Sequence, residues 1–329
     1  MGLVEELQRR VDAGLIRRQV SDDGLAIWCY TERCTYSRGW DKYTRMSRGL
    51  VTEGDLIVGL PFPKFFNQNQ QECPPLPDEP YAISTKLDGS LLIAFWDQER
   101  WRLVTKGSFN NIYTAYGVEQ LGEKLARMPR HITVMMEVVF PPAMDSMARC
   151  VAHEPGLYYL GARDAYTGKD MTHAAREYWD GDKSAAPVVA RIEDLLERAC
   201  EHEGEEGWVV LFESGLRIKI KTAWYLRLFR AVSNLSERRI KELMAEVGHG
   251  AWLEEFPEEL RDEAEAIYAG IQERFTARRT AILQTLAEVR SPDRKAFALS
   301  IATHPDKAYL FLGYDSRWDV FDKKLLLDV

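Results

Sequence analysis

Cysteine is scarce in this sequence of 329 residues, and its spacing forms no recognisable pair. The five cysteines are scattered, and no two of them stand in a Cys-x-x-Cys arrangement: Cys29, Cys34, Cys73, Cys150 and Cys200. An odd, unpaired set of this kind argues against a disulfide framework and against a structural zinc site. We therefore expect a protein of a reducing compartment, the cytoplasm.

Long apolar runs and a net positive charge are also missing. No run approaches the ~20 apolar residues that cross a membrane, and the first residues enter an amphipathic pattern at once, so we expect neither a secretory signal nor a membrane partner. The formal net charge is −8, so any contact with nucleic acid must depend on a local basic surface. The 46% of hydrophobic and 29% of charged residues are typical of a globular protein.

Hydrophobic patterning divides the chain at about residue 230. Before that point, apolar or alternating runs predict a series of strands, with a short helix at 3–13, a loop at 34–44 and a mostly helical stretch at 174–204. After it, helical spacing dominates, including a long pattern that opens at Pro257. The predicted fold class is α+β: a domain of antiparallel β-sheets with flanking helices in residues 1–230, followed by an all-helical C-terminal domain in residues 231–329.

The stretch Ser84–Ser90 is the centre of the first domain. An apolar run leads into it, a second strand leaves it, and Asp88-Gly89 supplies the sharp turn between them. Lys86 therefore stands at a strand end, where its amine can leave the core without the desolvation cost of a buried position. Asp-Gly after a strand is also ordinary turn chemistry, so a solvated surface turn is the alternative.

Three further lysine and arginine positions lie at strand ends or among aromatic residues. Arg48 stands at the mouth of a strand, and Lys106 precedes Gly107-Ser108, whose exposed amides can assist in binding phosphate. Lys64, between Pro63 and Phe65, either snorkels to the surface or contacts phosphate above an aromatic floor. A solvated turn is the alternative for Lys106.

Two acidic residues and a pair of lysines complete the set. Glu137 interrupts the apolar strand 132–140, which suggests either a buried ion pair or a carboxylate that faces a ligand hydroxyl or a metal. Glu206 enters a strand, and Lys219 and Lys221 share one face of the strand that returns. Such lysines either protect an edge strand from aggregation or contact a polyphosphate. Six cations and two carboxylates suit a triphosphate with a divalent metal.

The order of these motifs resembles the phage-type RNA ligase 1 family, a branch of the covalent nucleotidyltransferases. Four segments match the nucleophile motif and the third, fourth and fifth motifs of that family: Lys86-Leu87-Asp88-Gly89-Ser90, Met136-Glu137-Val138, Glu206-Gly207-Trp208-Val209 and Lys219-Ile220-Lys221. Two features resemble RNA ligase 1 more particularly, namely Lys64-Phe65-Phe66-Asn67 and the step from Lys221 into Trp224-Tyr225. The resemblance covers about residues 15–230, and four ordered motifs make a chance match improbable.

The resemblance implies an ATP-dependent RNA ligase whose Lys86 carries AMP. In the family pattern the catalytic positions are Lys86, Glu206, Lys219 and Lys221, and the positions that contact ATP include Arg48, Lys64, Thr85, Lys86, Lys106, Glu137, Glu206, Lys219, Lys221 and Tyr225. Glu137 would hold the ribose hydroxyls, Tyr225 would pack near the nucleotide, and Glu206 would be a ligand of Mg²⁺ or Mn²⁺. The implied partner is RNA with 5′-phosphate and 3′-hydroxyl ends, a nicked tRNA in RNA repair being one candidate, and we expect a monomer in the cytoplasm, or in the host cytoplasm if a phage encodes it.

Three other functions fit parts of this pattern. DNA ligases and mRNA capping enzymes usually carry a small β-barrel after the fifth motif, whereas this chain becomes helical after Thr222, which favours an RNA ligase. A non-catalytic protein that binds RNA ends would keep the nucleotide site without joining RNA. Retention of Lys86, Glu137, Glu206 and both paired lysines argues against such a decayed site.

Overall fold

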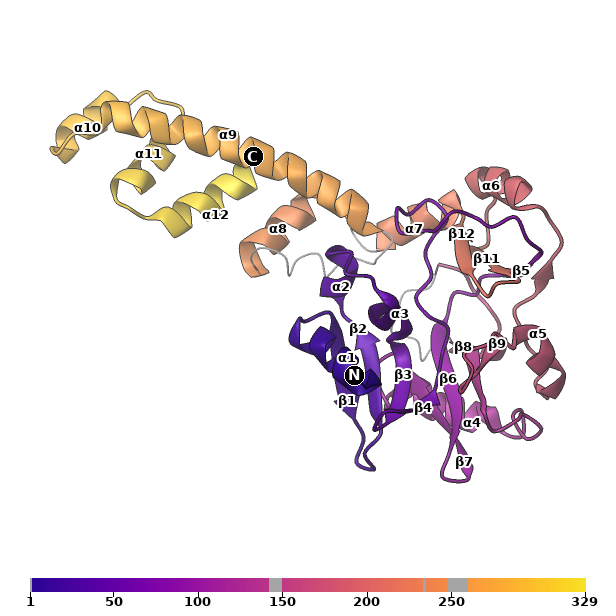
Figure 1. The fold of residues 1–329 in the computed structure, drawn as a ribbon. Helices are drawn as coiled ribbons and strands as arrows, with labels where there is room; N and C mark the ends of the chain where they lie inside the picture. The colour runs from indigo at the N-terminus through magenta and orange to yellow at the C-terminus, as the bar shows by residue number, and fades with distance from the viewer. Residues whose placement is uncertain (1, 142–149, 233–234, 248–259) are drawn as a thin grey trace. The chain divides into compact units, whose positions relative to one another are not determined.

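The computed structural model describes residues 2–141, 150–232, 235–247 and 260–329. Contacts divide the chain into two compact units, Met1–Phe229 and Arg230–Val329 (Figure 1). The first unit contains three four-stranded antiparallel sheets with flanking helices, and the second contains helices only among its described residues. The predicted α+β fold class is confirmed. No helix in the described ranges combines the length and apolar character that a membrane span requires.

The first sheet is a meander in the order β1-β2-β3-β4. Its strands are β1 (Ile16–Val20), β2 (Ala26–Tyr30), β3 (Arg48–Glu53) and β4 (Leu56–Gly59). Helix α1 (Leu3–Asp12) buries Leu7 in one core cluster with Ile16 and Trp28. The predicted loop at 34–44 is wrong, because it contains most of α2 (Glu32–Tyr36) and the start of α3 (Lys42–Met46). Side-chain caps from Thr31 and Asp41 start these two helices.

The second sheet has the order β7-β6-β8-β9. Its strands are β6 (Ser90–Asp97), β7 (Arg100–Thr105), β8 (Ile132–Val139) and β9 (Gly156–Asp164). Helix α4 (Ile112–Leu121) contacts β6, β7 and β9, and Tyr116 from it joins the core of this sheet. A second core cluster joins the first two sheets, with Ile27 and Val51 against Ile93 and Phe95.

The third sheet has the order β10-β5-β11-β12, and the site residues of three motifs lie within its strands or directly next to their ends. Its strands are β5 (Tyr81–Thr85), β10 (Pro187–Val188), β11 (Gly207–Phe212) and β12 (Arg217–Lys221), and α6 (Ile192–Glu201) packs on it through Leu195. The helical prediction for 174–204 is only partly right. Helix α5 (Thr172–Ala175), the short turn Arg176–Tyr178 and α6 are helical, but the intervening segment is irregular and forms β10.

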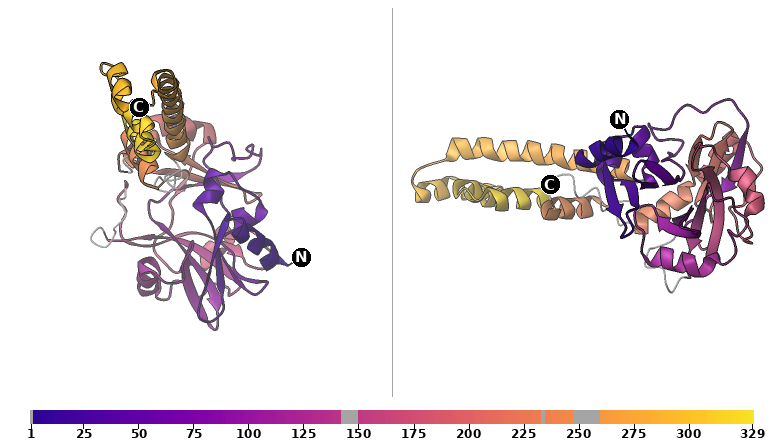
Figure 2. Two further views of the ribbon diagram at one scale, coloured as in Figure 1. Left: turned by 90° about the vertical axis from the view of Figure 1, so that its left-hand side faces the viewer. Right: turned by 60° about the horizontal axis from the view of Figure 1, so that its bottom comes forward.

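The second unit is built around one long helix. Helix α9 (Arg261–Val289) contacts α8 (Glu237–Val247), α11 (Lys307–Tyr314) and α12 (Trp318–Asp328). Figure 2 shows α12 running beside α9. Helix α10 (Arg294–Ser300) adds the fully buried Phe297 to a core that also contains Leu310 and Phe321. Helix α7 (Ala223–Val232) spans the boundary between the two units, and the helix start predicted at Pro257 lies outside the described residues.

Candidate active site

Neighbouring strands of the third sheet bring the lysine of the nucleophile motif to the acidic residue of the fourth motif. In the register of β5 with β11, Thr85 lies opposite Trp208, and the Lys86 amide donates to the Gly207 carbonyl at 2.8 Å. On the other side of β11, Gly207 lies opposite Lys221 of β12. Hydrogen bonding between the strands therefore fixes the backbone positions of Lys86, Glu206 and Lys221 next to one another.

Glu206 forms ion pairs with both lysines. Its Oε2 lies 2.8 Å from Lys86 Nζ, and its Oε1 lies 2.9 Å from Lys221 Nζ. Burial alone would raise the pKa of Glu206, which is 2% exposed, but the charges and hydrogen bonds of Lys86 and Lys221 lower it. Glu206 is therefore ionised at neutral pH and holds both ammonium groups.

Gly207 is required for this close arrangement of strands. Its φ is +141°, and a Cβ added there would lie 2.0 Å from the Ile220 carbonyl oxygen. Only glycine tolerates both the backbone conformation and the approach of β12. The glycine after Glu206 in the fourth motif thus sets the distance between the strands that carry Glu206 and Lys221.

The turn after Lys86 is held by a segment that sequence analysis did not identify. Asp88 accepts hydrogen bonds from the amides of Cys150 at 2.8 Å and Val151 at 3.1 Å, and its own amide donates to His153 Nε2 at 3.2 Å. Burial lowers the pKa of His153, which keeps the ring neutral and able to accept this bond. The sequence contains no signal for this contact, because the partners lie more than 60 residues apart.

Glu137 lies directly against the same turn. A Cβ at Gly89 would meet Glu137 Cγ at 2.6 Å and the Val138 carbonyl oxygen at 2.7 Å, so the absence of a side chain at Gly89 allows β8 to approach. The carboxylate predicted from the third motif is therefore a neighbour of the nucleophile motif.

A second group of cations is arranged around two aromatic rings. Arg48 Cζ lies 5.5 Å and Lys219 Nζ 5.2 Å from the centroid of the Phe65 ring. The β12 backbone also joins this region, since the Lys219 amide donates to the Phe66 carbonyl at 2.9 Å. Arg48 and Lys219, whose residue numbers differ by 171, thus contact the same aromatic ring, that of Phe65.

Lys64 and Lys106 share the ring of Tyr30 in the same way. Their Nζ atoms lie 5.9 Å and 5.1 Å from its centroid, and Lys64 also faces Trp40 and Phe66. Lys64 is 1% exposed, so the surface-snorkelling alternative is wrong. Interaction with Tyr30 raises the pKa of Lys106 against the opposing effect of burial, and Lys106 is therefore cationic at neutral pH. Sequence analysis missed Tyr30 and Trp40.

Tyr225 packs beside the lysine of the fifth motif. Lys221 Nζ lies 4.8 Å from the Tyr225 ring centroid, and that ring stacks on Phe229 with a centroid separation of 5.3 Å. Tyr225 is buried, so the start of α7 forms a wall beside Lys221.

Two buried polar atoms near the cationic group lack a hydrogen-bond partner. They are Arg48 Nη1 and Asn67 Oδ1, and neither has a partner within the described ranges. Buried groups of this kind are normally satisfied, so Arg48 Nη1 could donate to a phosphate oxygen and Asn67 Oδ1 could accept from a hydroxyl or amino group of a nucleotide. In the same ranges no cluster of three or more His, Cys, Asp or Glu side chains could hold a metal ion. Glu206 could be only one ligand of a metal whose remaining ligands come from phosphates and water.

Comparison with known proteins gives the family and the fold of this chain. A family model described as RNA ligase matches residues 46–225, and the chain belongs to this family. An archaeal ATP-dependent RNA ligase is 16% identical over 91% of this chain and 86% of its own, with a TM-score of 0.52, and confirms the fold.

Two other solved structures match less well. The RNA ligase from Naegleria gruberi solved with PPi is 13% identical over 46% of this chain, with a TM-score of 0.37, and the matched part is 52% of the Naegleria chain. This chain therefore spans about half the length of that relative. A putative ATP-dependent DNA ligase from Aquifex aeolicus is 14% identical over 98% of this chain and 77% of its own, with a TM-score of 0.46.

Proposed function

We propose that this member of the RNA ligase family is ATP-dependent and joins a 5′-phosphate RNA end to a 3′-hydroxyl end through AMP linked to Lys86. The observation that carries the proposal is the contact of one buried carboxylate, Glu206, with the lysines of two motifs at 2.8 and 2.9 Å. Residues 1–230 would be the adenylyltransferase domain, and residues 231–329 a helical domain that supports it or contacts RNA. A nicked tRNA is the substrate we favour for a role in RNA repair.

In the first step the Lys86 amine would attack the α-phosphorus of ATP, with loss of the amine proton and departure of pyrophosphate. Glu206 Oε2 lies 2.8 Å from Lys86 Nζ, so it holds the nitrogen in a fixed position until the proton leaves. Lys221 would compete for the same carboxylate and weaken its hold on Lys86. Arg48, Lys64, Lys106 and Lys219 would bind the negative charge of the phosphates.

A divalent metal, Mg²⁺ or Mn²⁺, would neutralise phosphate charge at this site, with Glu206 as the candidate protein ligand. Glu137, which lies against the nucleophile turn, is the candidate for holding the ribose hydroxyls. Thr85 precedes Lys86 at the end of β5, and Tyr225 would bound the nucleotide next to Lys221. AMP would then pass to the 5′-phosphate, and the attacking 3′-hydroxyl would release it as a phosphodiester forms.

The test is covalent labelling. The protein is first treated with pyrophosphate to remove any bound AMP, and then incubated with α-labelled ATP and Mg²⁺. We expect label that survives denaturation in the wild type and none in Lys86→Ala, whereas Lys295→Ala, a lysine of the second unit, should label normally. Wild-type protein that takes no label would overturn the proposal. Joining of 5′-phosphate RNA but not of 5′-hydroxyl RNA or of DNA ends is expected in the same mixture.

A further inference from the structure

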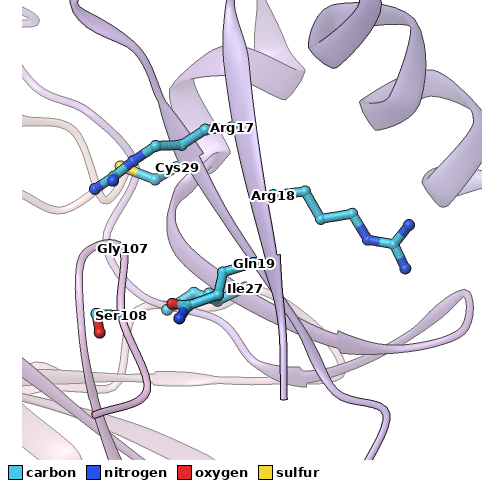
Figure 3. A pocket seen from close by; sticks show the side chains of 7 residues that line it. All are labelled: Arg17, Arg18, Gln19, Ile27, Cys29, Gly107 and Ser108. Carbon is cyan, nitrogen blue, oxygen red and sulfur yellow. The ribbon is translucent and has the colours of Figure 1, made fainter. Parts of the chain in front are cut away.

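A hollow of about 350 Å³ lies at the free edge of the first sheet, separate from the lysine–carboxylate contacts. Its walls come from β1, from β2 and from the turn that follows β7: Arg17, Arg18, Gln19, Ile27, Cys29, Gly107 and Ser108. In the register of the two strands Arg17 lies opposite Cys29, and Gln19 lies opposite Ile27. Figure 3 shows Arg17 and Gln19 on the side of Gly107 and Ser108, while Arg18 extends the other way.

The chemistry of this hollow suits an anion. No acidic residue lines it. The side chain of Arg17 is exposed and forms no ion pair or hydrogen bond among the described residues.

The turn opposite Arg17 adds hydrogen-bond donors. The amides of Gly107 and Ser108 have no acceptor within the described part of the chain, and Gly107 has no side chain to separate them from a ligand. A Cβ at Gly107 would lie 2.1 Å from Arg17 Nη2, so the guanidinium and the turn approach closely. Free amides beside an arginine form the kind of concavity that binds phosphate oxygens.

The same turn connects the hollow with the cationic group around Tyr30. Lys106 immediately precedes Gly107, and its ammonium faces the Tyr30 ring. Because Lys106 and Gly107 are adjacent in the chain, a strand of RNA whose terminal phosphate is near Lys106 would lie close to this turn. Ile27 and Cys29 give the hollow an apolar floor against which a ribose can rest.

We propose that the hollow between β1 and the Gly107–Ser108 turn binds a backbone phosphate of the RNA substrate, one or a few nucleotides away from the reacting end. The inference rests on the proposed function, since it names a second contact for the substrate of the same active site. Arg17 supplies the charge, and the amides of Gly107 and Ser108 supply directed hydrogen bonds.

The experiment compares two adjacent arginines of β1. Arg17→Ala removes the guanidinium that faces the Gly107–Ser108 turn. Arg18→Ala is the matched control, because Arg18 borders the hollow but its side chain extends away from it (Figure 3), with the guanidinium 5.1 Å from the Trp28 ring centroid. Each full-length variant is titrated with a fluorescent 5′-phosphorylated single-stranded RNA of 12 nucleotides at several salt concentrations. Labelling with α-labelled ATP in the absence of RNA is measured in parallel.

We expect Arg17→Ala to weaken RNA binding roughly three- to tenfold and to reduce the slope of log K against log salt by ~0.7, the value for one phosphate contact on a single strand. Arg17→Lys should recover part of the affinity, and labelling with AMP should match the wild type. Equal RNA affinity for Arg17→Ala and wild type, or an equal loss in Arg18→Ala, would overturn the inference.

Inorganic phosphate separates two sources of the anion. If millimolar phosphate lowers the RNA affinity of the wild type to that of Arg17→Ala, phosphate competes with the RNA for the hollow, as the inference requires. If phosphate binds to the wild type but not to Arg17→Ala and leaves the RNA affinity of the wild type unchanged, the hollow is a site for free phosphate and the inference about RNA is wrong. A wild-type protein that binds the RNA but takes no AMP would overturn the proposed function, and the Arg17 comparison would still decide the role of the hollow.

Discussion

Glu206 forms ion pairs with Lys86 and Lys221, two lysines that come from different strands and different motifs. The side chains of Glu206 and Lys221 are buried, with 3% and 5% of their surface exposed, whereas the Lys86 side chain is 21% exposed. Removal of one member of a buried ion pair leaves the other charge without compensation, which is costlier than loss of a surface pair. At the scale of single residues, the stability of the fold and the position of Lys86, the proposed nucleophile, therefore depend on one carboxylate.

The Glu206→Gln variant should lose both stability and labelling by ATP. We expect its free energy of unfolding at pH 7 to fall by about 3 kcal/mol, because the Lys221 ammonium is left in a buried site without a carboxylate. Urea titrations followed by circular dichroism measure this change. Covalent labelling should fall more than tenfold, and an unchanged midpoint would show that the two ion pairs contribute nothing to stability.

Acid should remove the same contribution in the wild type. The pKa of Glu206 is lowered in the folded protein from its ordinary value of 4.5, so the stabilisation is complete above that value and is lost as the pH falls through the lowered folded-state pKa. Urea midpoints of wild type and Glu206→Gln should therefore converge as the pH falls from about 5 through the lowered pKa of Glu206. A difference that stays constant over this range would contradict the assignment.

At the scale of elements, the β11–β12 hairpin depends on a glycine that no other residue replaces. Gly207→Ala combines a backbone at φ +141° with a clash against the Ile220 carbonyl, so we expect a loss of more than about 3 kcal/mol. Gly215→Ala in the same hairpin is the control. Its φ is +84°, but its Cβ would meet only Asp170 Cβ at 3.8 Å, so it should cost about 1–2 kcal/mol. Urea titrations of both variants give the comparison, and equal losses would exclude the clash as a cause.

In α9 the opposite change is expected. Gly270 lies inside this helix, and a Cβ there would meet nothing nearer than Arg274 Nη1 at 3.6 Å. Gly270→Ala should therefore stabilise the helical unit by about 0.5–1 kcal/mol, because alanine restricts the unfolded chain and favours the helix. The thermal midpoint of the helical unit is the measurement, and a lower midpoint would indicate a packing contact at this position.

Two of the helices that sequence analysis missed share one cause. Helices α3 and α4 begin with capping boxes in which Thr44 and Thr114 take the place usually held by Glu or Gln, so the sequence signature was absent. The strands and the β11–β12 hairpin were predictable, because apolar runs and turn residues are local signals. The order of motifs also predicted the residues that meet at Glu206. The contacts of Lys64 and Lys106 with the Tyr30 ring, and of Arg48 and Lys219 with the Phe65 ring, were not predictable. They depend on how segments far apart in the sequence pack together.

At the scale of the whole molecule, the residues proposed for chemistry all lie in the first unit. The boundary between Phe229 and Arg230 falls inside α7, so a cut there would remove the end of the helix that carries Tyr225. A chain truncated after Leu235 keeps all of α7 and should still be labelled by α-labelled ATP, within about tenfold of the full chain. Loss of labelling in a truncated protein that melts cooperatively would show that residues 236–329 complete the active site.

The trio of Lys86, Glu206 and Lys221 holds two positive charges and one negative charge, so it carries an excess of +1 before any ligand arrives. An arriving polyphosphate would balance that excess. Conversion of the Lys86 amine into a phosphoramidate would then remove one of the two cations and add the negative charge of the phosphoramidate. The net charge of this small group would thus change from +1 in the resting protein to −1 in the intermediate, so the resting protein would be the form that attracts anions.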